Sequence, residues 1–248
     1  MSAPTGMPPA LAPLPEDFER VLAVVAHPDD LEYGTSAAVD RWTRSGVEVT
    51  YLLATRGEAG IDTLAPEQAR DLRAQEEIDG AAEVGAVVEF LDYLDGVVEY
   101  STALRRDIAR AIRRLRPQVL VAMSPDVVMP WGLNQADHRA VGMAAIDACR
   151  DAGNRWVHWQ LLDVEGLAPW SPSWILVYGS DRPTHYVDCT GHLGPAIASL
   201  QAHRLYNAAL SGDMADPHTV VTRVLQGGAQ AVGEPSVEHA VLFTRHAV

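Results

Sequence analysis

The 248-residue sequence contains no lysine, since all 19 of its basic side chains are arginine. This absence excludes a Schiff-base lysine and the phosphate-binding lysine of a P-loop. A glycine-rich phosphate loop is also missing after the first predicted strand, at residues 21–25. The sequence therefore argues against a nucleotide-binding Rossmann enzyme.

Cysteine is scarce as well. Cys149 and Cys189 stand far apart, and neither has a CxxC partner. The sequence therefore indicates neither a disulfide framework nor a thiolate zinc site, and we expect a reducing, cytoplasmic location.

Long apolar runs and an excess of positive charge are absent too. No run approaches the roughly 20 residues that span a bilayer, so we expect no membrane segment. The formal net charge of -14 disfavours nucleic acid as a partner, because that binding draws its affinity from clustered cations. Residues 1–18 are proline-rich and lack the features of a signal peptide. We interpret them as a flexible arm ahead of one domain at 19–248.

Short apolar runs alternate with segments of helical composition over the first two thirds of the chain. This pattern predicts an α/β fold, Rossmann-like, with a mostly parallel sheet and helices on both faces. The predicted strands are 21–25, 47–54, 87–91 and 119–123, and the predicted helices are 35–44, 67–84 and 101–115. Because ligands bind at the carboxyl ends of such strands, the loops that follow them should converge on one site.

The last third of the chain is less regular. The sequence predicts helices at 137–151 and 195–210 and strands at 174–178 and 185–187. The segment 212–235, with its glycines and prolines, is interpreted as a mobile loop or lid.

Metal-binding residue types follow the first predicted strand directly, in His27-Pro28-Asp29-Asp30. Zinc takes nitrogen and oxygen ligands, and a catalytic site keeps three protein ligands and a water molecule. His27 and Asp30 can supply two ligands, which leaves Asp29 free to act as a base.

The third ligand has to come from another segment, and the best candidate is His138. It lies after the fourth predicted strand, so the topology brings it to the same sheet edge. Asp137 could orient a neighbouring imidazole. The alternative is that Asp137 caps a helix and His138 is a surface imidazole.

Together these residues resemble a known family. Ala26-His27-Pro28-Asp29-Asp30 with Gly34 is similar to the AHPDDxxxG signature of the LmbE-like, or PIG-L-like, zinc deacetylases. The resemblance implies one Zn²⁺ per chain held by His27, Asp30 and His138, with Asp29 as the general base.

Further segments extend the resemblance. Thr55-Arg56-Gly57-Glu58-Ala59-Gly60 looks like the family's TxGExG loop, Arg73 with Glu76 looks like its RxxE helix, and Asp95-Gly96 is similar to its Asp-Gly segment. We expect Arg56, Arg73 and Asp95 to bind substrate hydroxyls, and we place Trp131 near the substrate. Ion pairs on the surface are the alternative for both arginines.

One position departs from the family pattern. Where the family usually carries a histidine in its second motif, this chain has Gln135, whose amide can stabilise an oxyanion but cannot deliver a proton. The general acid is therefore left open between Asp29, which could return the proton, and His203, His185 or His246. His203 lies in a helix where the family often has a histidine.

These residues predict a metal-dependent deacetylase that removes an N-acetyl or other small N-acyl group from an amino-sugar conjugate. A non-catalytic sugar- or metal-binding module on the same fold is the alternative, although such a module needs no base at position 29. The sequence leaves the exact substrate, and a homo-oligomeric state, open.

Overall fold

A mixed sheet of eight strands runs through the centre of the molecule, in the order β1-β9-β10-β8-β5-β2-β3-β4. The computed structural model describes residues 10–248. Five strands are parallel to one another: β2 Arg20–Val25, β3 Glu48–Leu53, β4 Val87–Phe90, β5 Val119–Met123 and β8 Trp174–Tyr178. They confirm the predicted parallel sheet with its four expected strands, and the strand predicted at 174–178 joins it as a fifth parallel strand.

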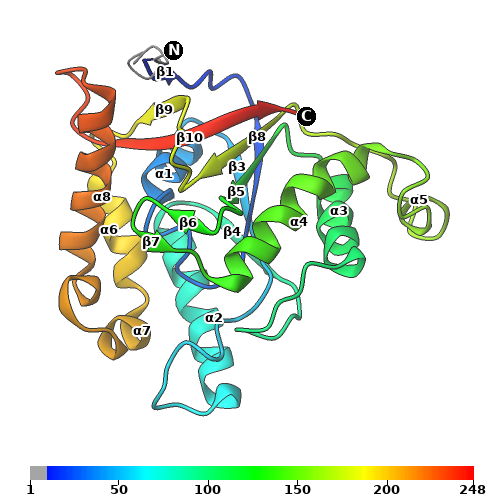
Figure 1. Cartoon of the computed structure of the whole chain (residues 1–248), viewed down its shortest axis with the longest axis horizontal. Coiled ribbons are helices and arrows are strands. Elements are labelled where there is room, and N and C mark those ends of the chain that lie inside the picture. The colour runs from blue at the N-terminus through cyan, green and yellow to red at the C-terminus, as the bar shows by residue number, and fades with distance from the viewer. Residues whose placement is uncertain (1–9) are drawn as a thin grey trace, which may run out of the picture.

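Helices cover both faces of this sheet (Figure 1). Side chains of β2 alternate between two cores, as expected for a strand buried on both sides. Val21, Ala23 and Val25 pack in the core below α1 Ser36–Arg44, α6 Leu193–Gln201 and α8 Pro217–Val232. Leu22 and Val24 pack in the opposite core, below α3 Thr102–Leu115 and α4 Ala136–Gly153. The chain is thus a single α/β domain with the predicted layers.

The strand order reverses between β2 and β5. After β2 the chain moves outward through β3 and β4, and then returns to place β5 on the other side of β2. Loops after β2 and β5 therefore leave the sheet in opposite directions and open a crevice between them. This crevice is where the predicted metal-binding residues meet.

The prediction of a mobile loop or lid at 212–235 is wrong. The segment forms a short 3-10 helix, Gly212–Ala215, and then α8, which begins where the Asp216 side chain accepts the His218 N–H and ends at Gly233 with φ +74°. Val220, Val221 and Leu225 are buried along α8. Two glycines in the middle of α8 hid its helical period, and burial of its apolar face outweighs their cost.

The predicted helix at 195–210 is two helices. After α6 the chain turns at Ala202 and His203 and continues as α7 Arg204–Ala209. The Asn207 side chain donates to the Leu200 carbonyl oxygen at 2.7 Å and so holds the two helices together.

A long strand near the end of the chain was missed. β10 Ala240–Ala247 lies between β8 and β9 His185–Asp188 and is antiparallel to both (red in Figure 1). The smaller elements are the hairpin β6 Val128–Met129 and β7 Gly132–Leu133, and the helices α2 Pro66–Glu83 and α5 Gln160–Asp163.

Residues 10–18 do not form the flexible arm that was expected over 1–18. β1 Ala12–Pro13 pairs with β9, and both Leu14 and Phe18 are buried. The Trp42 indole donates to the Glu16 carboxylate at 2.8 Å. Residues 1–9 lie outside the described part of the chain. Among residues 10–248, no helix is long and apolar enough to cross a membrane.

Candidate metal centre and active site

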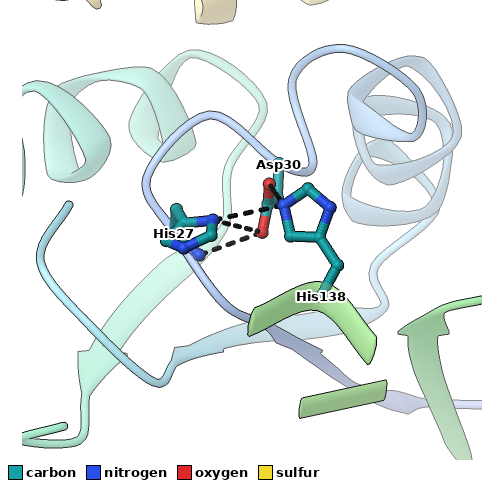
Figure 2. A group of neighbouring side chains, drawn as sticks. All are labelled: His27, Asp30 and His138. Carbon is teal, nitrogen blue, oxygen red and sulfur yellow. Dashed lines mark hydrogen bonds and ion pairs between the residues drawn. The ribbon is translucent and has the colours of Figure 1, made fainter. Parts of the chain in front are cut away.

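The three predicted metal ligands come together in the crevice between β2 and β5. Figure 2 shows His27 and Asp30 on the loop after β2, with His138 reaching them from the first turn of α4. His138 Nε2 lies 3.2 Å from His27 Nδ1 and 3.0 Å from Asp30 Oδ1, and His27 Nδ1 lies 3.7 Å from Asp30 Oδ2. The expected convergence of the loops therefore brings three potential ligand atoms within reach of one ion.

Hydrogen bonds determine which nitrogen of His27 carries the proton. Nε2 faces two carboxylate oxygens, Asp95 Oδ1 at 3.1 Å and Asp137 Oδ2 at 3.2 Å. Since carboxylates only accept, Nε2 carries the hydrogen and the Nδ1 lone pair faces His138 and Asp30. Asp137 is thus an orienting partner of His27, as the sequence suggested.

Asn134 determines the proton position in His138. Its amide nitrogen donates to the carbonyl oxygens of Ser124 and Asp126, at 2.8 and 2.9 Å, so its Oδ1 is the atom that faces His138 Nδ1 at 3.1 Å. His138 Nδ1 therefore donates, and its Nε2 lone pair faces the other two ligand atoms.

When both imidazoles are neutral, two lone pairs and a carboxylate oxygen converge, and these electron-pair donors repel one another. A divalent cation satisfies all of them at once, and this nitrogen and oxygen set suits Zn²⁺ in a site with an open position. The neighbouring group of His27 Nε2, Asp95 and Asp137 is committed to hydrogen bonds. Both Asp137 oxygens accept backbone N–H groups, from Gly96 and Val98.

The surrounding charges shift the pKa values of Asp30 and His27. Burial raises the pKa of Asp30, but the two imidazoles outweigh burial and hold that pKa well below its usual value. Burial lowers the pKa of His27, and hydrogen bonds to Asp137, Asp30 and Asp95 outweigh it and raise the pKa.

Asp29, the predicted base, is buried and adopts φ +90°, in the left-handed region that non-glycine residues rarely visit. Such a conformation costs about 1–3 kcal/mol and is found mostly at functional sites. Arg73 Nη2 donates to Asp29 Oδ2 at 3.1 Å. Burial raises the pKa of Asp29 to about 7, although Arg73 opposes the shift. A carboxylate with this pKa is suited to proton transfer near neutral pH.

Arg73 and Asp95 lie inside the protein rather than where a substrate hydroxyl could reach them. The Arg73 guanidinium is 2% exposed and donates to the Pro28 and Gly57 carbonyl oxygens. A side chain at Gly57 would collide with that guanidinium, which explains the glycine of this loop. The Asp95 carboxylate is buried against His27 and the Ala59 N–H. Both residues hold the site together.

Arg56 and Trp131 remain accessible. Arg56 pairs with the exposed Asp92 and lies over the Phe90 ring. Trp131 is 68% exposed on the hairpin between β6 and β7, and its ring edge lies over Gly179. Their predicted roles in binding substrate stay predictions.

Of the candidates for the general acid, Asp29 lies beside the ligand cluster and the three histidines do not. Gln135, the predicted oxyanion donor, is exposed at the N-cap of α4. His203 is fully buried near Glu32 and Glu77, and burial lowers its pKa to about 3. His185 and His246 lie on β9 and β10, beyond β8 and β5 from the site. The buried position of His203 excludes direct contact with a substrate.

Sequence reasoning missed three residues beside the predicted ones. Asn134 orients His138 from one turn before it, Glu77 accepts the Asp29 N–H at 3.0 Å, and the Tyr206 ring lies 4.0 Å from the Arg73 guanidinium carbon. Glu77 follows Arg73 by four residues on α2, a spacing that places both on one helix face. Tyr206 was hidden because α7 was not recognised as a separate helix.

Known proteins are similar to this chain in sequence. The family described as GlcNAc-PI de-N-acetylase, PIG-L, matches residues 22–149. The diacetylchitobiose deacetylase of Thermococcus kodakarensis is 30% identical over 190 residues, which cover 75% of this chain and 70% of that protein. A 1D-myo-inositol 2-acetamido-2-deoxy-alpha-D-glucopyranoside deacetylase of Kineococcus radiotolerans is 30% identical over 250 residues, with 74% and 68% covered.

A solved structure agrees with these matches. N,N'-diacetylchitobiose deacetylase from Pyrococcus horikoshii superposes with a TM-score of 0.82 at 25% identity, covering 94% of this chain and 85% of that one. From its sequence match, its fold and its relatives, the chain belongs to the PIG-L, or LmbE-like, family of de-N-acetylases.

Proposed function

We propose that this protein is a zinc-dependent hydrolase that removes the N-acetyl group from an amino-sugar-containing small molecule. One observation carries the proposal: the potential ligand atoms of His27, Asp30 and His138 converge directly beside a buried, conformationally strained carboxylate. A protein that only binds a sugar or a metal has no use for such a carboxylate.

His27, Asp30 and His138 would hold the cation. Once bound there, Zn²⁺ would supply Lewis acidity for the amide carbonyl and for water. Asp29 lies between the two ligands of its own loop, and its carboxylate would take the proton from the attacking water. Arg73 keeps that carboxylate oriented through Oδ2.

The proton must then reach the departing amine. Gln135 cannot deliver a proton, and His203 has no surface through which to do so. We infer that Asp29 returns the proton that it took from water. Acetate and the free amino sugar are then the products, and no second acid is required.

The substrate class follows from the relatives, whose names describe N-acetylated glucosamine in chitobiose and in an inositol conjugate. A compound that carries N-acetylglucosamine is therefore the proposed substrate, with Arg56 and Trp131 at the accessible rim. Another small N-acyl group on the same sugar is the variant of this proposal that a substrate panel would reveal.

Acetate release from a panel of N-acetylglucosamine conjugates tests the proposal, with metal content measured by elemental analysis. We expect about one zinc per chain in the wild type, and loss of metal and activity in His138→Ala. Asp29→Asn should keep the metal and lose turnover by orders of magnitude, because it cannot accept the proton. Normal turnover by Asp29→Asn would remove the base from the mechanism.

A further inference from the structure

We propose that Glu77 is a positioning residue that holds the base Asp29 in its left-handed conformation. This inference rests on the proposed function of Asp29, and it adds a role for a buried carboxyl that touches neither metal ligand nor substrate. Glu77 is 1% exposed and lies on α2.

The conformation of Asp29 needs support from its surroundings. Its φ of +90° is one of three positive values among the described non-glycine residues. Backbone in this region persists only where neighbouring groups hold it in place. A relaxed Asp29 would turn its peptide N–H and its carboxylate in other directions.

Two side chains from one face of α2 hold Asp29 at its two ends. Glu77 Oε2 accepts the Asp29 backbone N–H at 3.0 Å, and Arg73 Nη2 donates to the Asp29 carboxylate at 3.1 Å and to the Pro28 carbonyl oxygen at 2.7 Å. Arg73 thus fixes the side chain, and Glu77 fixes the peptide that sets φ.

The position of α2 is itself tightly defined. A Cβ at Gly80 would lie 2.8 Å from the Ser199 carbonyl oxygen and 3.0 Å from His203 Nε2, so α2 and α6 approach more closely than a larger residue allows. His203 Nε2 also lies 3.7 Å from Glu77 Oε2. The buried His203 therefore limits where the Glu77 carboxyl can move.

A buried glutamate at position 77 should lower the stability of the fold, so its presence calls for a functional reason. Its Oε1 has no hydrogen-bond partner among the described residues, and Glu32 Oε2 beside it has none either. Burial of unpartnered polar atoms destabilises a fold. The hydrogen bond to the Asp29 N–H is the interaction that offsets this cost, and it acts on the base.

The test compares three variants of Glu77 with a control on the same helix. Glu77→Gln keeps an oxygen that can accept the N–H, Glu77→Asp keeps the carboxyl group but shortens its reach, and Glu77→Leu removes the acceptor. Glu76→Leu is the control, since Glu76 is also buried on α2 but accepts the Leu205 N–H instead. Each purified variant is assayed for kcat, KM and zinc content, and crystal structures are determined for Glu77→Gln and Glu77→Leu, or Glu77→Asp if Glu77→Leu does not fold.

We expect Glu77→Asp and Glu77→Leu to lose about 10²-fold in kcat, the usual effect of a misplaced catalytic group, with KM and zinc content near wild type. Glu77→Gln and Glu76→Leu should stay close to wild type in kcat. The proposal is overturned if Glu77→Asp and Glu77→Leu keep their kcat, or if Glu77→Gln loses as much as they do.

The crystal structures of the variants test the role of Glu77 independently of activity. We expect Asp29 to keep its positive φ in Glu77→Gln and to leave it in Glu77→Leu, and in Glu77→Asp if that is the variant crystallised. A wild type without acetate release would refute the proposed function alone. An unchanged Asp29 in a variant that has lost the acceptor would refute the role of Glu77, whatever the activity.

Discussion

Asn134 fixes the proton position of His138, a proposed metal ligand. Its amide oxygen holds the His138 Nδ1 proton, and its amide nitrogen is fixed by two backbone carbonyl groups after β5. An imidazole oriented in this way presents its lone pair at low entropic cost. We therefore expect Asn134 to affect the affinity for the metal and not the proton transfer.

Asn134→Ala should weaken zinc binding by about 10- to 100-fold, the usual cost of removing an orienting partner. Competition with a chromophoric chelator measures the affinity. Gln135→Ala is the matched control, because Gln135 is the exposed neighbour and lies at the helix cap. Equal affinities for Asn134→Ala and wild type would show that the fold alone orients His138.

His203 should make the fold sensitive to acid. Burial first, and the Arg73 charge second, lower its pKa from 6.5 to about 3. The facing carboxyls of Glu32 and Glu77 do not hold an imidazolium in place, because burial raises their own pKa values. Between about pH 3 and pH 6.5, His203 is therefore protonated in the unfolded chain and neutral in the folded protein.

The stabilisation from neutral His203 is complete above pH 6.5 and declines as the pH falls toward 3. The free energy of unfolding of His203→Gln should therefore fall less steeply across this window, by up to about 1.4 kcal/mol per pH unit. Urea unfolding at several pH values measures the slopes. His218→Gln, at an exposed histidine of α8, should match the wild type. Parallel slopes for His203→Gln and wild type would contradict the expectation.

At the scale of elements, α8 covers the sheet and does not act as a lid. Leu225 is 2% exposed in the core that α8 shares with α6 and the sheet, whereas Val224 is 41% exposed. Leu225→Ala should lower the free energy of unfolding by about 2–4 kcal/mol because it leaves a cavity. Val224→Ala should cost far less.

Denaturant unfolding measures both α8 variants, and kcat and KM should stay unchanged in each. A segment that closes over substrate would give the opposite result, with little loss of stability and a raised KM. That outcome would restore the lid interpretation of 212–235.

The elements around the proposed metal site were predictable because each has a strong local signal. Apolar runs mark the strands buried on both faces, and the histidine and carboxylates follow them at fixed places, so topology alone brings His27, Asp30 and His138 together. The helix α8 and the strand β10 have weak local signals and depend on distant contacts. The roles of Arg73, Asp95 and His203 depend on burial, which spacing in a sequence does not report.

At the scale of the whole molecule, the proposed reactive residues and the helices that pack around them come from different parts of the chain. All three proposed metal ligands and the base lie between residues 27 and 138, on the loops at the point where the strand order reverses. The later segments supply α6 and α7, which pack against α2, and α8, which packs against α6 and β10, together with the antiparallel side of the sheet. Substitutions in the later part should therefore act through stability or positioning rather than through the chemistry itself.

The place of β10 in the sheet has a consequence for how the protein is made. β9 joins the rest of the sheet only through β10, which pairs with β9 on one side and β8 on the other. During synthesis, residues 240–247 leave the ribosome long after the residues of the proposed metal site. The nascent chain can therefore bring these residues together while the edges of β8 and β9 that face β10 are still unpaired. Such open edges invite association with other chains. Premature termination before residue 240 would therefore yield aggregates rather than a slower enzyme.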